Sequence, residues 1–144
     1  KVPEVNFNIY PEDFKAIHPA FANLTETLTA KGQLNGRISN LRFQQIEMQY
    51  GENLKLLADI DFSGLPNIDD VFIFAQIHEL SADKGVAQDI VSSFSKRPFV
   101  LPSELNKLGK INYNGNITGF SSNLVVFGNL KIYNFVVGYY LLNL

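Results

Sequence analysis

Few side chains in this sequence could bind a metal or carry out a reaction. The two histidines, His18 and His78, lie far apart, and neither is accompanied by further ligands at metal-binding spacing. The chain has no cysteine, which excludes disulfides, zinc–thiolate sites and thiol chemistry together. The serine pairs at 92–93 and 121–122 lack the glycine-framed turn that exposes a nucleophilic serine. We therefore expect neither a metal site nor covalent catalysis.

Two acidic pairs are the remaining candidates for acid–base chemistry. Asp59 and Asp61 alternate with apolar residues, as on the solvated face of a strand, and Asp69-Asp70 lies just after the turn sequence GLPN. A solvated face and a turn explain these carboxylates better than general acid–base catalysis does. The chain also has no glycine-rich phosphate loop. We therefore predict that it is not an enzyme and that it needs no metal or other cofactor.

The composition permits a packed core but indicates neither nucleic-acid binding nor a membrane span. With 144 residues, of which 46% are hydrophobic, the chain fits one domain or one piece of a larger protein. Its net charge is −2 and it has no basic block, so no nucleic-acid partner is expected. A membrane-spanning helix needs about eighteen consecutive apolar residues without charge, and no stretch of this sequence is that long. Because the chain starts Lys1-Val2-Pro3, we expect a processed chain or an internal segment, with any membrane anchor outside it.

The clearest strand pattern lies at residues 54–63. Apolar residues occupy every second position, whereas Lys55, Asp59, Asp61 and Ser63 lie between them, with Leu57 as the only exception. This period of two predicts an antiparallel strand with one apolar face and one solvated face. The apolar face consists of Leu54, Leu56, Ala58, Ile60 and Phe62.

A second alternating segment, residues 111–120, places amides opposite apolar residues. Ile111, Tyr113 and Ile117 alternate with three asparagines, and Gly115 and Gly119 would allow the strand to bend or the sheet to curl. The apolar positions of the strand that follows are Leu124, Val126, Leu130 and Ile132.

Further upstream, the apolar positions change parity within one strand. They are odd at 41 and 43 and even at 46, 48 and 50. A strand cannot turn its apolar side chains to the other face without an extra residue. Gln44-Gln45 is therefore predicted to form a β-bulge.

Residues 71–77 are apolar on both faces, so both sides of this strand must be covered. Apolar residues at 86, 87, 90, 91 and 94 recur at helical spacing and predict an amphipathic helix over 84–96, which would supply the cover. A second short helix is predicted between Ser103, a good N-cap, and Gly109. The predicted fold is mainly β, a β-rich α+β chain. It would be a curled antiparallel sheet, an open groove or a sandwich, with one or two short helices inserted at about 84–109.

Two glycine-containing segments read alike. Residues 32–41 (GQLNGRISNL) and 109–120 (GKINYNGNITGF) both follow the order glycine, apolar, polar, glycine, polar, isoleucine, with two extra residues in the second. Each precedes a strand, a glycine and another strand. We interpret them as repeated β-units of an elongated sheet.

Several motifs in one order resemble a known family. They are LPNID at 65–69, PFVLPSEL at 98–105, Leu108-Gly109, YNGNITGF at 113–120 and NLVVFGNL at 123–130. Together they resemble the TamB-like translocation and assembly module proteins of Bacteroidetes, within the AsmA-like superfamily. The resemblance extends from about Pro11 to Leu130 and depends on order and spacing rather than on any single motif. Residues 131–144 depart from the polar, glycine-containing strands with which that family normally continues.

The resemblance implies that this chain is an internal fragment of a much longer protein. Members of the family are anchored in the inner membrane, span the periplasm and form a long curled β-sheet with an apolar groove. They are implicated in phospholipid transport to the outer membrane and in outer-membrane protein assembly with a barrel partner. The resemblance thus implies a periplasmic segment that contacts phospholipid acyl chains, in a protein whose partner is an outer-membrane barrel assembly protein.

The groove lining that we expect from this resemblance coincides with the apolar strand faces. It comprises Leu54, Leu56, Ile60, Phe62, Ile111, Tyr113, Ile117, Leu124 and Val126. These residues could instead form an ordinary sandwich core, and the chain would then be a cell-envelope binding module that recognises protein or glycan through its loops. A groove segment would also leave unpaired sheet edges, which predicts edge-to-edge association of the isolated chain.

Overall fold

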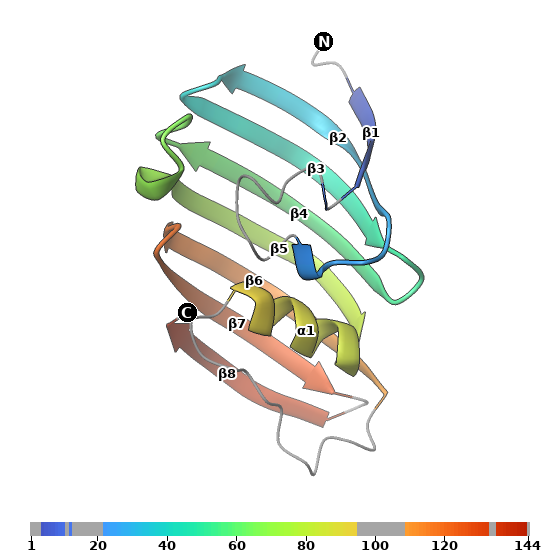
Figure 1. The fold of residues 1–144 in the computed structure, drawn as a ribbon. Coiled ribbons are helices and arrows are strands. Elements are labelled where there is room, and N and C mark those ends of the chain that lie inside the picture. Colours follow the sequence, from blue (N-terminus) through green and yellow to red (C-terminus); the bar gives the residue numbers. More distant parts are fainter. Residues whose placement is uncertain (1–3, 11, 13–21, 95–108, 133–134, 144) are drawn as a thin grey trace.

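The computed structural model describes residues 4–10, 12, 22–94, 109–132 and 135–143 (Figure 1). Eight antiparallel strands form one sheet and pair in chain order. Their bounds are β1 Glu4–Ile9, β2 Leu28–Arg37, β3 Asn40–Tyr50, β4 Leu54–Ser63, β5 Phe72–Asp83, β6 Lys110–Phe120, β7 Asn123–Ile132 and β8 Phe135–Asn143. A 3-10 turn, η3 (Ile68–Asp70), precedes β5, and the helix α1 (Lys84–Phe94) follows it directly. Most of the second predicted helix lies outside the described residues.

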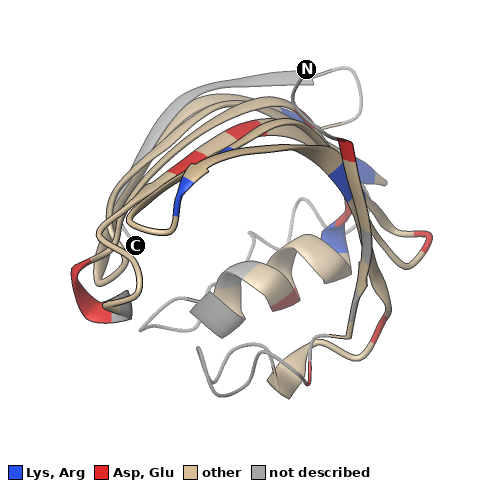
Figure 2. Ribbon diagram, turned by 90° about the horizontal axis from the view of Figure 1, so that it is seen from above, with Lys and Arg blue, Asp and Glu red and all other residues tan. Residues whose placement is uncertain are grey.

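The sheet is curled and does not close on itself. Figure 2 shows the strands bent into an arc with α1 on its inner side. β1 pairs with β2 and β8 pairs with β7, and neither outer strand has a second partner among the described residues. The mainly-β prediction is therefore confirmed as one curled antiparallel sheet, not as the two packed sheets of a sandwich.

The apolar side of the sheet is its concave side. Leu56, Leu80 and Tyr113 are paired across β4, β5 and β6. Directly paired residues point to the same side of a sheet. Ile111 and Ile132 pair with each other in the next row of the same alternation and pack against α1, so this apolar side is the one inside the arc. We call it the concave face.

The change of parity in β3 is a β-bulge, as predicted. The register of β3 on β4 shifts between Phe43 and Ile46, and Gln45 has a φ of 51°, which is uncommon for a residue other than glycine. The Gln45 backbone N–H donates a hydrogen bond to Asp59 Oδ1 at 2.7 Å. A carboxylate therefore satisfies the backbone group that the bulge exposes.

β5 contains a second bulge that the sequence pattern did not predict. Its register on β6 shifts between Ile77 and Leu80, so the even-numbered Leu80 and Ala82 join the odd-numbered Ile77 on the concave face. The strand consequently continues to Asp83, beyond the predicted segment 71–77, and α1 begins at the next residue.

A glycine pair lets an aromatic ring lie flat on the concave face. Gly115 and Gly128 are paired, and a Cβ on Gly128 would lie 2.7 Å from both the Gly115 Cα and the Tyr113 ring. The Tyr113 hydroxyl donates to the Phe127 carbonyl oxygen at 3.0 Å. Glycine usually weakens a strand interior, but here it makes room for a ring that covers both residues.

α1 covers only one side of the sheet, which corrects the expectation that it would cover residues 71–77 on both sides. Ala87 packs against Ile111 and Ile132 on the concave face. Phe72 and Phe74 point to the convex side and remain 38% and 42% exposed.

The glycine repeat exists at the hairpins, in a different alignment from the one expected. Gly36 and Gly119 each lie one residue before the end of a strand, with φ of 105° and 137°. The following residues read GRISNL and GFSSNL, and each glycine pairs with the final leucine of its motif. A Cβ at Gly36 would collide with the carbonyl oxygen of Asn40, and a Cβ at Gly119 would collide with that of Asn123. Each asparagine lies four residues after its glycine, across the hairpin turn. The expected alignment matched Gly36 with Gly115 instead.

Substituting alanine at two glycines should have opposite effects. Gly128→Ala forces a methyl group against the Gly115 backbone and the Tyr113 ring, so we expect a loss of about 1–3 kcal/mol in the free energy of unfolding. Gly85→Ala in α1 meets no atom within 4 Å, and alanine is favoured over glycine in helices by about 0.5–1 kcal/mol. Urea unfolding of the two variants measures the difference, and equal stabilities would contradict this account of the glycine pair.

Candidate functional site

The nine residues predicted to line a groove lie together on the concave face. Register places them in four rows that cross β4 to β7. The rows are Leu54–Ala82–Ile111, Leu56–Leu80–Tyr113, Ile60–Ala75–Ile117–Val126 and Phe62–Ile73–Gly119–Leu124. One apolar surface, continuous from strand to strand, is therefore assembled from segments that are distant in the sequence.

This surface is closed at one end and partly open at the other. Ala82, Ile111 and Ile132 are between 1% and 6% exposed, and the latter two lie against α1. In the opposite rows Ala75 is buried, whereas the larger apolar side chains are only partly buried: Ile60, Phe62, Ile73, Ile117, Leu124 and Val126. The concave face away from α1 therefore presents apolar side chains that solvent still reaches.

Small residues occupy the middle of the concave face. Ala58 is fully buried and Ala75 nearly so, and with Ile77 they form a cluster against which Leu56 and Ile60 pack. Side chains converge on the inner side of a curled sheet, so alanine at the centre leaves volume for larger neighbours.

No position on the concave face of β2 to β7 carries a charged side chain. Its polar atoms are two tyrosine hydroxyls, and both are bonded to the backbone. The Tyr50 hydroxyl accepts the N–H groups of Thr25 and Glu26 at 2.8 and 3.0 Å. Burial raises the pKa of Tyr113, so its hydroxyl stays neutral. The face can hold apolar groups but offers no acid, base or nucleophile to a substrate.

The charged residues of the strands lie on the convex face and pair across strands. Lys31–Glu47 at 2.8 Å and Arg42–Asp61 at 2.9 Å are ion pairs, and His78 Nε2 forms a hydrogen bond with Asp59 Oδ2 at 2.7 Å. The interpretation of Asp59 and Asp61 as a solvated strand face is thus confirmed, and Asp69 and Asp70 lie in the turn η3. His78 gains a partner that sequence spacing did not reveal.

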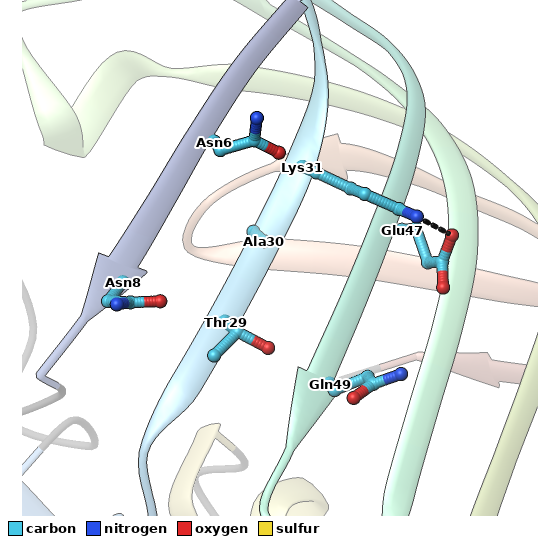
Figure 3. A pocket seen from close by; sticks show the side chains of 7 residues that line it. All are labelled: Asn6, Asn8, Thr29, Ala30, Lys31, Glu47 and Gln49. Carbon is cyan, nitrogen blue, oxygen red and sulfur yellow. Dashed lines mark ion pairs between the residues drawn. The ribbon is translucent and has the colours of Figure 1, made fainter.

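A shallow polar pocket lies on the convex face of β1 to β3 (Figure 3). Its volume is about 350 Å³. The lining is Asn6, Asn8, Thr29, Ala30, Lys31, Glu47 and Gln49. Register arranges the polar members in two rows of three, each crossing all three strands. This pocket could not be predicted from the sequence, because polar residues that alternate along a strand are typical of an ordinary solvated face.

Sequence reasoning also missed part of the apolar surface. Leu80 and Ala82 were hidden by the bulge in β5, which reverses their parity. Leu130 and Ile132 continue the alternation of β7 and were recognised as apolar positions but not included in the lining. Extending the period of two to the end of that strand would have found them.

Comparison with protein-family models, curated proteins and solved structures finds no match for this chain. Among the described residues, no helix is long and apolar enough to cross a membrane.

Acid should weaken the fold partly through Asp59. The Gln45 N–H, and then His78, lower the pKa of this carboxyl. A lowered folded-state pKa stabilises the fold above the ordinary aspartate pKa of about 4, and this stabilisation is lost as the pH falls through the folded-state value. In Asp59→Asn, the free energy of unfolding should therefore fall less between pH 6 and pH 2 than in the original chain, as measured by urea unfolding.

The matched control for this prediction is Asp89→Asn, which removes an exposed carboxyl from α1. It should keep the original dependence on pH. An Asp59→Asn variant that loses as much stability in acid as the original chain would contradict the role of the bulge contact.

Proposed function

We propose that this chain is a non-enzymatic segment of a cell-envelope scaffold whose concave face guides phospholipid acyl chains. The observation that carries the proposal is the apolar surface of β4 to β7, which is free of charged side chains, continuous across strands and partly exposed away from α1. An acyl chain needs no specific polar contact, only a continuous surface that removes it from water. Each buried methylene contributes about 0.8 kcal/mol, and this does not depend on its position along the surface.

The resemblance to TamB-like proteins supplies the wider setting of this proposal. In that setting the segment belongs to a periplasm-spanning protein anchored in the inner membrane, which delivers phospholipid to the outer membrane and acts with a barrel assembly protein. Within the described part of the chain, the outer sides of β1 and β8 have no strand partner, which is compatible with this setting because further strands could extend the apolar surface by about 4.8 Å each. They are equally able to pair with a second copy of the isolated chain.

The position of α1 sets a condition on any lipid path. Ile111 and Ile132 are already covered by the helix, so an acyl chain has access to the rows that contain Ile60 and Phe62. Passage along the whole strand length would require α1 to move away from the sheet. The proposed lipid path therefore crosses the strands on the part of the concave face that α1 does not cover.

A second candidate is a binding module that uses the convex polar pocket. Three amides, a hydroxyl and an ion pair could match the hydroxyl groups of a glycan, each of which both donates and accepts hydrogen bonds. In that case lipid would not bind in the hollow.

Photocrosslinking distinguishes these candidates. A benzophenone amino acid at Ile117 faces the hollow, whereas the same group at Thr118 faces the convex side. We expect irradiation with phospholipid vesicles to give lipid adducts, detected by mass spectrometry, several-fold more at 117 than at 118. Absence of adducts at 117, or equal yields at the two positions, would contradict the lipid proposal.

A charge placed in the hollow should block lipid. Val126 lies on the concave face beside Ile117, and Val125 is its convex neighbour beside Thr118. We expect Val126→Glu to lower the binding of a fluorescent phospholipid at least tenfold, because the carboxylate would lose hydration against the acyl chain. Val125→Glu should leave binding close to that of the original chain. The proposal fails if both variants, shown to be folded by circular dichroism, bind lipid equally.

A further inference from the structure

Four phenylalanines are exposed on the convex face, where the rest of the sheet is mainly polar. Phe72 and Phe74 of β5 are 38% and 42% exposed, Phe120 of β6 is 53% exposed, and Phe127 of β7 is 50% exposed. Phe72 and Phe120 are paired, and their rings meet edge to face with centroids 5.3 Å apart. We call these four residues the aromatic patch.

The aromatic patch is too large to be dismissed as scattered surface apolar residues. A phenylalanine side chain can bury about 150–250 Å², so four of them at roughly half exposure leave about 270–460 Å² uncovered. Contiguous apolar patches of this size on monomers are often functional. Apolar side chains lie on both sides of β5, and α1 packs on the concave side against Ile111 and Ile132 of the neighbouring strands, so it leaves Phe72 and Phe74 exposed.

The aromatic patch is bordered by carboxylates at one end and by an ion pair at the other. Asp69 and Asp70 lie in η3, and the hydroxyl of Ser121, the residue after Phe120, donates to the Asp69 carbonyl oxygen at 3.4 Å. On the β4 side, Asp61 is the register partner of Phe74 and its charge is neutralised by Arg42 at 2.9 Å. The margin at η3 is therefore acidic.

The geometry points to a docking surface for a protein segment that carries apolar side chains with a lysine or arginine at one end. The apolar side chains would pack on the aromatic patch, and the basic residue would lie against Asp69 and Asp70. An anionic membrane surface fits less well, because those carboxylates would face lipid headgroups of the same sign. A dimer through this patch alone fits less well too, because its area is about half of the roughly 800 Å² that each partner buries in a stable interface. This inference does not depend on what the hollow binds.

Selection from a phage-displayed library of twelve-residue peptides tests the proposal. The full chain serves as bait, and phage that also bind Phe74→Ser/Phe120→Ser are removed. Enriched peptides should combine aromatic or aliphatic residues with a terminal lysine or arginine. A synthetic copy should bind the original chain with a Kd at least tenfold lower than it binds the double serine variant. Asp69→Asn/Asp70→Asn should weaken binding by a smaller factor and reduce its sensitivity to salt.

Two controls separate binding from folding. Asn112→Ser changes the convex face of β6 away from the patch and should leave peptide binding unchanged. Circular dichroism and urea unfolding must show that the double serine variant remains folded, and Phe74→Tyr, which keeps the ring, should retain most of the affinity.

Three results would overturn the inference. The first is that no peptide is enriched over the double serine variant. The second is binding to phosphatidylcholine vesicles that the serine substitutions abolish, which would identify a membrane surface. The third is a dimer in sedimentation analysis that the same substitutions dissociate, which would identify a second copy of this chain.

Discussion

Alternation of side chains across a single pleated sheet is the constraint on which the rest of this structure depends. With a period of two, shifting any strand by one residue would turn its whole apolar set toward water. Three of the strands, β3, β5 and β8, contain an extra residue, and the register shifts at that point. At Gln45 the bulge is held by the Asp59 carboxylate, and in β5 the shift between Ile77 and Leu80 returns the apolar positions to the concave face.

Curling adds a second constraint, because the inner side of an arc has less room than the outer side. The concave face answers with alanine at its centre and with glycine beneath the Tyr113 ring. The convex face has no such limit and holds the long charged side chains, which pair across strands. The division of residue types between the faces therefore follows both from polarity and from volume.

Local pattern was sufficient to predict much of this arrangement. Residues 54–63 form β4 with the predicted bounds, the parity change placed the bulge at Gln44-Gln45, and all nine lining positions lie on one face. Each of these inferences used periodicity within a strand, which depends only on backbone geometry. The function assigned to that face rested on a family resemblance, and periodicity carries no information about what an apolar surface binds.

Features that depend on more than one strand were predicted less well. The bulge in β5 reverses the parity of Leu80 and Ala82, so the period of two could not be followed beyond Ile77, and the residues on which α1 packs lie in two later strands. The hairpin motif is shared by Gly36 and Gly119, but the sequence comparison aligned Gly36 with Gly115, four residues earlier in the same strand. That alignment matched the residue types and not the distance of each glycine from the end of its strand. The convex pocket was not predicted at all, since its six polar side chains come from three separate strands.

Pairing in chain order has a consequence for how such a protein can change over time. Every strand contacts the strands next to it in sequence, so each hairpin is a nearly self-contained increment of the sheet. Duplication or loss of one hairpin would lengthen or shorten the hollow by about 10 Å while leaving the remaining contacts intact. The length of the concave face could then vary through the number of hairpins alone, without any change in how the side chains of one hairpin pack on the next.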